Sequence, residues 1–245
     1  MLIAEEAKSS QMIEEEIVHV DGHPEKLVIF LHGYLDSAPA LDRRLAPLLD
    51  NVSNVAVHIP QAPEICEILD NKRQWYSMHR FDPDDARRFV PSMTECVSIY
   101  DKMGLGLNEA FSYLNPYIQN CLYDYGLESK DLYLCGFSQG AMVAIYTALM
   151  QEENIGGCIS FSGIITPHTF LSKHALSRPN TLLIHGEADN LVRFEAQKFT
   201  KEQLEKIGCS VQTYVVPDGQ HRVTSDGLLQ TASFINQRTT KKLAI

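Results

Sequence analysis

The sequence lacks the features that would assign it to several common classes of protein. None of its six cysteines belongs to a C-x-x-C pair, so their spacing fits neither a disulfide scaffold nor a zinc site, and we expect reduced, mostly buried thiols. No apolar run approaches the roughly 20 residues of a membrane-spanning helix, and the first residues contain no apolar stretch typical of a secretory signal. The sequence therefore predicts no stable membrane insertion and a cytoplasmic location.

Positive charge is scarce as well. Lysine and arginine number 21 against 31 aspartates and glutamates, which gives a formal net charge of −10. Nucleic acids and anionic membranes select basic surfaces, so we expect no nucleic-acid partner. Walker A and H-E-x-x-H motifs are absent, and the acidic stretch from Asp82 to Asp85 lacks the glycine and terminal glutamate of a calcium loop. No cofactor and no metal is predicted.

What the 245 residues do contain is a series of short, β-branched-rich apolar runs separated by helical patterns. Nearly continuous apolar strands are typical of a parallel sheet covered on both faces, so we predict an α/β fold with helices on each side of the sheet. The length suits a single domain, residues 1–245, with any flexibility confined to about residues 1–13. The expected strands are Leu27–Leu31, Val55–Ile59, Asp131–Cys135, Gly157–Phe161, Thr181–His185 and Val211–Val216, and the expected helices are Ala40–Leu49, about Leu105–Tyr125, Gln139–Met150, Arg193–Ile207 and Gly227–Asn236.

Two segments stand outside this regular alternation. Residues 14–20 are expected to form an antiparallel strand pair with the first apolar run, joined by Asp21-Gly22-His23-Pro24. Residues 60–104 form a connection much longer than usual, which contains the only tryptophan of the chain. Long connections at the C-terminal edge of a parallel sheet tend to line a site, so we expect this segment to border the active site.

The motif that carries chemistry is Gly136-Phe137-Ser138-Gln139-Gly140. It lies between an expected strand and an expected helix, which is the order of a nucleophile elbow. Such a turn presents the serine above the sheet edge, and the flanking glycines leave room for a strained backbone and close packing. G-x-S-x-G fixes only three residues and occurs by chance, so the flanking strand and helix carry the prediction that Ser138 is a nucleophile.

A serine hydroxyl needs a general base, and in this chain order an acid and then a histidine should follow it. Asp189 comes directly after one expected strand, and His221 comes after the next. We predict that Asp189 is the orienting acid and His221 the general base. Glu187 is the rival acid, whereas Asp218 in Pro-Asp-Gly is more simply a turn residue.

An oxyanion that develops during attack requires backbone donors. The N–H of Gln139 would lie at the start of the helix behind Ser138, and the loop after the first expected strand offers a second N–H at Tyr34. His32, in the same loop, could be mistaken for a base. At a strand end before glycine it is expected to brace the loop through hydrogen bonds.

Apolar and aromatic residues in the predicted loops suggest an acyl-binding wall, because a soluble protein gains little by exposing them. They are Leu35, Trp75, Tyr76, Leu191 and Val192. The alternative is that they pack beneath the loops as a satellite core. A wall narrowed by bulky Tyr34 and Leu35 predicts a preference for short to medium acyl chains.

Together these motifs resemble the phospholipase/carboxylesterase family of α/β-hydrolases, whose members include acyl-protein thioesterases and small bacterial carboxylesterases. The resemblance spans about Leu27 to Ile235. Its landmarks are Phe30-Leu31-His32-Gly33 with Asp36, the Ser138 motif, His185-Gly186-Glu187-Ala188-Asp189 with Leu191-Val192, and the region around His221.

The resemblance implies the α/β-hydrolase fold, a triad of Ser138, Asp189 and His221, and an oxyanion hole at the N–H groups of Tyr34 and Gln139. It also implies that Arg73-Gln74-Trp75-Tyr76-Ser77 borders the acyl site. The chain departs from many members by having Leu35 where they have glycine and Tyr34 where they have a smaller apolar residue.

The sequence and the resemblance together predict a serine hydrolase that cleaves carboxylic esters or acyl thioesters through an acyl-enzyme. The expected partner is a small-molecule ester or thioester, an acylated protein or a lysolipid, and the chain is expected to be a monomer or homodimer. One alternative is a lysophospholipase, and another is a non-catalytic binding protein that retains the fold. A protein of the latter kind would be expected to have lost a triad residue, and none is missing.

Overall fold

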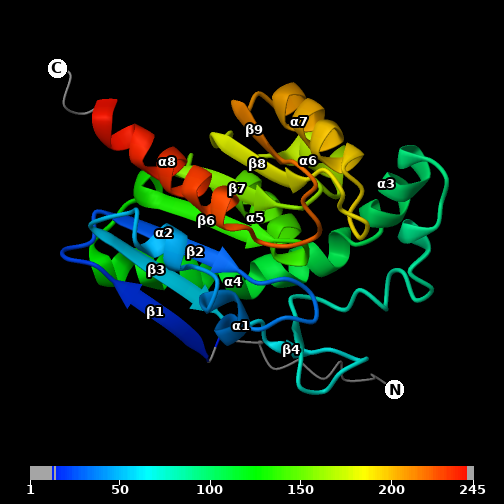
Figure 1. Cartoon of the computed structure of the whole chain (residues 1–245), viewed down its shortest axis with the longest axis horizontal. Helices are drawn as coiled ribbons and strands as arrows, with labels where there is room; N and C mark the ends of the chain where they lie inside the picture. Colours follow the sequence, from blue (N-terminus) through cyan, green and yellow to red (C-terminus); the bar gives the residue numbers. More distant parts are fainter. Residues whose placement is uncertain (1–12, 14, 242–245) are drawn as a thin grey trace, which may run out of the picture.

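A seven-stranded sheet forms the centre of the molecule, in the strand order β1-β3-β2-β6-β7-β8-β9 (Figure 1). The computed structural model describes residue 13 and residues 15–241, so the prediction of flexibility for about residues 1–13 falls almost wholly outside the described residues. β1 runs antiparallel to β3, and the other neighbours in this sheet are parallel. The strands are β1 (Glu16–Val20), β2 (Lys26–Leu31), β3 (Val55–Pro60), β6 (Leu132–Phe137), β7 (Gly157–Phe161), β8 (Thr181–Gly186) and β9 (Val211–Val216).

Helices cover both faces of the sheet, as the apolar strands predict (Figure 1). The helices α4 to α7 pack on one face, and α1, α2 and α8 pack on the other. The helices are α1 (Ala38–Asp42), α2 (Ala46–Leu49), α3 (Met93–Asp101), α4 (Gly104–Tyr125), α5 (Gln139–Met150), α6 (His168–His174), α7 (Glu195–Ile207) and α8 (Ser225–Lys241).

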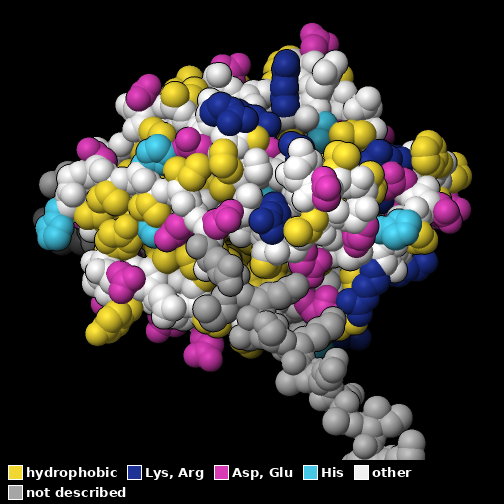
Figure 2. All heavy atoms as spheres, turned by 90° about the horizontal axis from the view of Figure 1, so that it is seen from below, with side chains coloured by type: hydrophobic (Ala, Val, Ile, Leu, Met, Phe, Trp, Pro, Cys, Tyr) yellow, Lys and Arg dark blue, Asp and Glu magenta, His cyan; other side chains and the backbone are white. Residues whose placement is uncertain are grey.

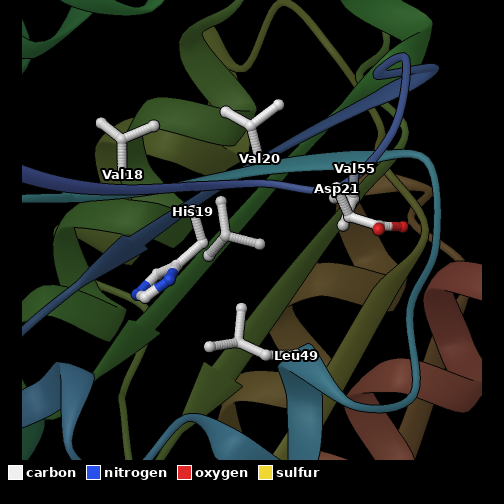
Figure 3. A pocket seen from close by; sticks show the side chains of 7 residues that line it. Val18, His19, Val20, Asp21, Leu49 and Val55 are labelled. Atoms are coloured by element: carbon white, nitrogen blue, oxygen red, sulfur yellow. The ribbon is translucent and has the colours of Figure 1, made fainter.

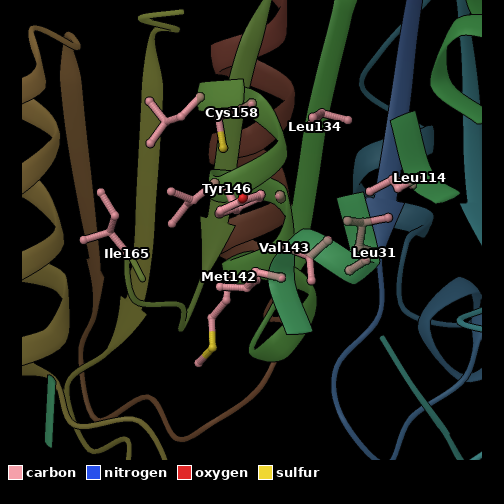
Figure 4. Packing of buried hydrophobic residues seen from close by; sticks show 14 of the residues in the cluster. Leu31, Leu114, Leu134, Met142, Val143, Tyr146, Cys158 and Ile165 are labelled. Carbon is pink, nitrogen blue, oxygen red and sulfur yellow. The ribbon is translucent and has the colours of Figure 1, made fainter. Parts of the chain in front are cut away.

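The sheet separates two apolar clusters, and β2 contributes alternate residues to each. Leu27, Ile29 and Leu31 belong to the cluster under α4 and α5, whereas Val28 and Phe30 belong to the cluster under α1, α2 and α8. Figure 4 shows the first cluster, in which Val143 and Tyr146 of α5 lie among side chains of the strands. A strand buried on both faces needs apolar residues at every position, which explains why the β2 run does not alternate with polar residues.

The predicted pairing of β1 with the first apolar run is wrong. β1 pairs instead with β3, with Glu16 opposite Pro60 and Val20 opposite Ala56. Both edges of β2 are occupied by parallel partners, β3 and β6, so no edge is left for β1. The chain between β1 and β2 crosses the start of β3, where the Asp21 N–H donates to the Val55 carbonyl at 3.0 Å.

The expected helix Ala40–Leu49 is divided into α1 and α2. Pro47 lies at the start of α2, where its missing N–H costs nothing, but within a continuous helix it would remove a hydrogen bond and clash with the preceding turn. Two short helices were not predicted, α3 and α6. α3 begins with a capping box in which the Ser92 hydroxyl accepts from the Glu95 N–H at 3.2 Å, a signal present in the sequence as S-x-x-E.

Residues 60–104 contain their own small elements and lie against the loop that follows β2. A second sheet of two short strands, β4 (Glu64–Ile65) and β5 (Arg73–Gln74), projects from it, followed by a 3-10 turn at Ala86–Arg88 and by α3. The backbone of Arg73 forms two hydrogen bonds with the loop after β2. Its carbonyl accepts from the Leu35 N–H at 3.2 Å, and its N–H donates to the Asp36 carbonyl at 3.3 Å. The long connection is therefore fastened to the loop that contains Tyr34.

Candidate active site

Ser138 occupies the turn between β6 and α5. Its backbone angles, φ 55° and ψ −117°, lie in a region that residues other than glycine rarely adopt. The Ser138 N–H donates to the Phe161 carbonyl on the neighbouring strand β7 at 2.9 Å, which holds the turn in place. The strained turn and its position after a strand are those of a nucleophile elbow.

Close backbone approach explains both glycines of the motif. A Cβ on Gly136 would lie 2.2 Å from the Gly140 carbonyl oxygen, and a Cβ on Gly140 would lie 2.4 Å from the carbonyl oxygens of Leu31 and His32. These atoms are backbone and cannot turn aside, so neither position accepts a side chain. The same approach places the loop after β2 directly against the first turn of α5.

The structure brings the three predicted triad residues together. His221 Nε2 lies 2.9 Å from Ser138 Oγ, and His221 Nδ1 lies 2.7 Å from Asp189 Oδ2. With the proton on Nδ1, the imidazole donates to Asp189 and can accept the serine proton on Nε2. The three side chains therefore form a continuous chain of hydrogen bonds from carboxylate to hydroxyl.

Backbone hydrogen bonds join the loop of Asp189 to the loop of His221. The Ala188 N–H donates to the Gly219 carbonyl at 2.8 Å, and the Glu187 N–H donates to the Val216 carbonyl at 3.0 Å. The Glu187 side chain is exposed and forms no hydrogen bond or ion pair with other described residues. Asp218 has φ 53° and lies in the turn before Gly219, as Pro-Asp-Gly predicts. The geometry thus favours Asp189 over its rival.

Asp189 is surrounded by donors. Its Oδ1 accepts from the N–H groups of Leu191 and Val192, each at 2.9 Å, while His185 Nε2 lies 3.4 Å from Oδ2 beside His221. Burial alone would raise the pKa of Asp189, but the hydrogen bonds from His185, His221 and the Val192 N–H outweigh it and hold the pKa well below its usual value. Asp189 is therefore an anion throughout the physiological pH range.

Two residues around the triad were not assigned a role from the sequence. His185 is buried at the end of β8, and its Nε2 lies 2.9 Å from the Val192 carbonyl as well as close to Asp189, so it fixes the acid loop. The Phe137 ring packs against His221 with ring centroids 4.8 Å apart. His185 stands four residues before the acid in His-Gly-Glu-Ala-Asp, but only the folded structure reveals which of its neighbours it contacts.

The N–H groups of Tyr34 and Gln139 are available as donors. Within the described residues, neither has a hydrogen-bond acceptor, and Gln139 N–H is the first of α5, directly after Ser138. Packing of Gly33 against the Phe137 ring brings the Tyr34 loop beside the elbow, because a Cβ on Gly33 would lie 3.0 Å from that ring. Both donors therefore lie in segments that touch the residues flanking Ser138.

His32 braces this loop. Its Nδ1 lies 2.8 Å from the Gly33 carbonyl, and its Nε2 accepts from the Ala62 N–H at 3.1 Å. Burial lowers the pKa of His32 to about 4, so the ring is neutral at pH 7 and keeps one donor and one acceptor. This is the bracing role expected from the sequence.

The structure places Trp75 and Tyr76 in the core and not on an open wall. Both side chains are 0% exposed and belong to the apolar cluster under α4 and α5, so neither has a surface to offer an acyl chain. Trp75 is also bonded to the elbow, because its backbone N–H donates to the side-chain oxygen Oε1 of Gln139 at 3.0 Å. The prediction that these two residues line an acyl-binding wall is therefore wrong. Long-range hydrogen bonds hold residues 75–76 beneath the loops.

The remaining residues of the predicted wall lie in two loops. Leu191 is 39% exposed, whereas Val192 is buried behind the acid that its N–H contacts. Leu35 is partly exposed and has φ 58°, a conformation that favours glycine and that the leucine adopts here at a strain cost. Of the five residues, Leu35 and Leu191 offer the most accessible surface for substrate contact.

Other features of the described residues lie away from Ser138. All six cysteines are buried and free. No group of three or more His, Cys, Asp or Glu in the described part of the chain is arranged to hold a metal ion, and no helix there is long and apolar enough to cross a membrane. Acidic, basic and apolar side chains are interspersed on the face shown in Figure 2.

Two hollows occur at a distance from the triad. One, of about 320 Å³, lies at the edge strand and is lined by residues such as Val18, His19 and Leu49 (Figure 3). The other, of about 400 Å³, lies between α3 and Phe199 of α7. Neither is lined by Ser138, Asp189 or His221.

The sheet, the elbow and the two loops that follow β8 and β9 define the class of protein, an α/β-hydrolase. Solved structures agree with this fold: the chain superposes on esterase PE8 with a TM-score of 0.75 at 25% identity, covering 91% of this chain and 97% of that one. It also superposes on an acyl-protein thioesterase 2 of Zea mays with a TM-score of 0.66 at 18% identity, covering 91% of this chain and 98% of that one.

Sequence comparison assigns the family. Residues 12–239 match the profile of the phospholipase/carboxylesterase family, and the chain belongs to that family. It is 24% identical over 243 residues to acyl-protein thioesterase 1 of Debaryomyces hansenii, covering 93% of this chain and 97% of the relative. It is 26% identical over 216 residues to a probable carboxylesterase of Oryza sativa subsp. japonica, covering 85% of this chain and 76% of the relative. The protein is thus a serine hydrolase of the carboxylesterase and acyl thioesterase type.

Proposed function

We propose that the protein hydrolyses carboxylic esters or acyl thioesters in two steps, with Ser138 as nucleophile, His221 as general base and Asp189 as orienting acid. The observation that carries this proposal is the hydrogen-bonded sequence from Asp189 Oδ2 through His221 to Ser138 Oγ, with distances of 2.7 and 2.9 Å. A serine hydroxyl at this distance from a neutral imidazole can transfer its proton as it attacks.

In the first step, Ser138 Oγ attacks the acyl carbonyl carbon while His221 Nε2 takes the hydroxyl proton. The tetrahedral intermediate carries its negative charge on the former carbonyl oxygen, where the N–H groups of Tyr34 and Gln139 stabilise it. The intermediate collapses, the bond to the alcohol or thiol breaks, and His221 returns the proton to the leaving group.

In the second step, a water molecule gives a proton to His221 and attacks the acyl-enzyme carbonyl. The second tetrahedral intermediate breaks the bond to Ser138 Oγ, which recovers its proton from His221, and the carboxylic acid leaves. Asp189 remains an anion in both steps, because its donors hold its pKa well below the usual value, and it stabilises the imidazolium that forms twice in the cycle.

The relatives suggest the kind of substrate. One is named an acyl-protein thioesterase and another a probable carboxylesterase, so an acyl thioester, including one on a protein, and a simple carboxylic ester both fit the proposal. Leu35 and Leu191, which have accessible surface near the predicted oxyanion loop and the acid loop, are proposed to contact the acyl chain. A lysophospholipid remains the second candidate, because the family includes phospholipases in its description.

A substrate panel tests the proposal. It comprises p-nitrophenyl esters of two to sixteen carbons, an acyl thioester series and a lysophospholipid, and it is run on the wild type, Ser138→Ala and Ser160→Ala. We expect Ser138→Ala to lose nearly all turnover while it remains folded. Ser160→Ala removes a buried hydroxyl from the neighbouring strand β7 and should retain ordinary turnover.

Each outcome of the panel has a distinct meaning. Specificity constants that rise over short to medium acyl chains and then level off fit a wall at Leu35 and Leu191, where each buried methylene contributes up to about 0.8 kcal/mol. Turnover confined to the lysophospholipid would assign the second candidate function. Ordinary turnover by Ser138→Ala would contradict the proposed nucleophile.

A further inference from the structure

Trp75 makes more polar contacts than a side chain that merely fills the core. It is 0% exposed, yet its indole Nε1–H donates to the His32 carbonyl at 2.8 Å and its backbone N–H donates to Gln139 Oε1 at 3.0 Å. Its own carbonyl accepts from the Tyr113 hydroxyl. The ring packs on apolar neighbours, on the Tyr113 ring with centroids 6.5 Å apart, and on the His32 ring with centroids 5.4 Å apart.

The two donations of Trp75 reach the two segments that carry the predicted oxyanion donors. His32 precedes Tyr34 by two residues in the loop after β2, and its carbonyl oxygen packs against Gly140. Gln139 contributes the other donor through its own N–H, while its side chain is held by the long connection. One residue therefore bonds both halves of the oxyanion hole, from a segment that is distant from each in the sequence.

The Gln139 side chain completes this connection. It is buried, and it uses both ends of its amide: Oε1 accepts from the Trp75 N–H, and Nε2–H donates to the Tyr76 carbonyl at 2.8 Å. Such a two-ended bond fixes where the first residue of α5 lies relative to residues 75–76. Because a buried amide that loses its hydrogen-bond partners leaves polar groups unpaired away from water, the contact resists displacement.

We propose that Trp75 is a positioning residue that sets the separation and direction of the Tyr34 and Gln139 N–H groups. The inference rests on the proposed function, because it assumes that these N–H groups stabilise the oxyanion. Donors fixed before the reaction require no reorganisation as charge develops, and removal of one donor from an oxyanion hole costs about 10²–10³ in kcat. A bond that aligns two such donors should therefore influence the chemical step more than substrate binding.

Since Trp75 is the only tryptophan of the chain, its indole N–H can be removed without altering any other residue. Expression in a tryptophan auxotroph supplied with 3-benzothienylalanine replaces the indole N–H by sulfur and keeps the size and shape of the ring. We expect kcat to fall about tenfold or more, with KM within about threefold of the wild type, because the donors become misaligned while the ground-state contacts persist.

A second measurement distinguishes positioning from a general loss of packing. A trifluoromethyl ketone forms a tetrahedral adduct with an oxyanion, so its inhibition constant should rise by the same factor by which kcat/KM falls. Gln139→Met removes the other end of the connection in a protein that keeps Trp75, and it should show the same split between kcat and KM. Tyr146→Phe is the matched control: it removes a buried aromatic hydroxyl from the same apolar cluster and should leave all three quantities unchanged.

Failure of this inference is distinguishable from failure of the proposed function. A wild-type protein that is neither inhibited by the trifluoromethyl ketone nor active on any ester or thioester would overturn the proposed function itself. A fully active wild type whose benzothienylalanine form and Gln139→Met variant both keep kcat within twofold would overturn the role of Trp75 alone. A loss confined to KM would also overturn it, because such a loss places Trp75 in substrate binding.

Discussion

At the residue scale, Asp189 has more hydrogen-bond donors than one orienting contact requires. Two backbone N–H groups saturate Oδ1, and His185 and His221 both approach Oδ2. The carboxylate plane is thereby fixed where it meets His221. An acid held in this way maintains the proton of the imidazole on Nδ1, which leaves Nε2 free to accept from Ser138.

Replacement of Asp189 should therefore lower kcat, because the His221 imidazole would adopt the wrong tautomer. In Asp189→Asn the amide can donate to His221 Nδ1, which would place the imidazole proton on Nε2 and block acceptance from Ser138. We expect kcat to fall by roughly 10⁴-fold, as in a serine protease with the equivalent change. Glu187→Gln, two residues earlier and exposed, serves as the control and should change kcat by less than a few fold. The assignment of the acid is wrong if the glutamine variant is the damaged one.

At the scale of elements, the loop after β2 is a rigid part of the site, because His32 bonds it internally and to Ala62. The pKa of His32 is lowered from 6.5 to about 4 by burial, so the unfolded chain binds this proton at a higher pH than the folded one. The free energy of unfolding contributed by neutral His32 is thus complete above about pH 6.5 and is lost as the pH falls towards 4.

Chemical denaturation at pH 7.5 and pH 5 measures this contribution. Between these values the wild type should lose about 2 kcal/mol more of its free energy of unfolding than His32→Gln, which has no titrating group at this position. Every other residue is the same in the two proteins, so its contribution cancels in the difference. Equal losses in the two proteins would mean that His32 titrates normally in the folded state.

The elements differ in how far the sequence predicts them. The β2, β6, β7 and β8 runs were predicted because a strand covered on both faces must be apolar throughout, and the elbow because a strand, G-x-S-x-G and a helix follow one another. The pairing partner of β1 was not predicted correctly, because the residue pattern of a strand does not indicate which edge of the sheet is free. The start of α3 could have been predicted from the capping box at Ser92.

The placement of Trp75 could not be predicted by the same means. An aromatic residue in a long connection is equally consistent with a substrate wall and with a satellite core. What decides between them is a hydrogen bond to Gln139, 64 residues away in the sequence, and one to His32, 43 residues away. Contacts of this range depend on the folded arrangement of three loops, and no local pattern of residues encodes them.

At the scale of the whole molecule, the sheet itself assembles the candidate site. Tyr34 follows β2, Ser138 follows β6, Asp189 follows β8 and His221 follows β9, and these strands are parallel. Their carboxyl ends therefore meet at one edge, where loops of different lengths converge. The prediction of one domain over residues 1–245 stays a prediction, as does the monomeric or dimeric state.

Covalent labelling is the measurement that tests the central claim most directly. The folded wild-type protein is treated with a fluorophosphonate, which reacts only with a serine activated by a neighbouring base, and the modified peptide is sequenced by mass spectrometry. We predict one added phosphonyl group per chain, located on Ser138, with labelling abolished in Ser138→Ala and strongly slowed in Asp189→Asn. Labelling of another serine, or labelling of Ser138 at the same rate in Asp189→Asn, would contradict the account.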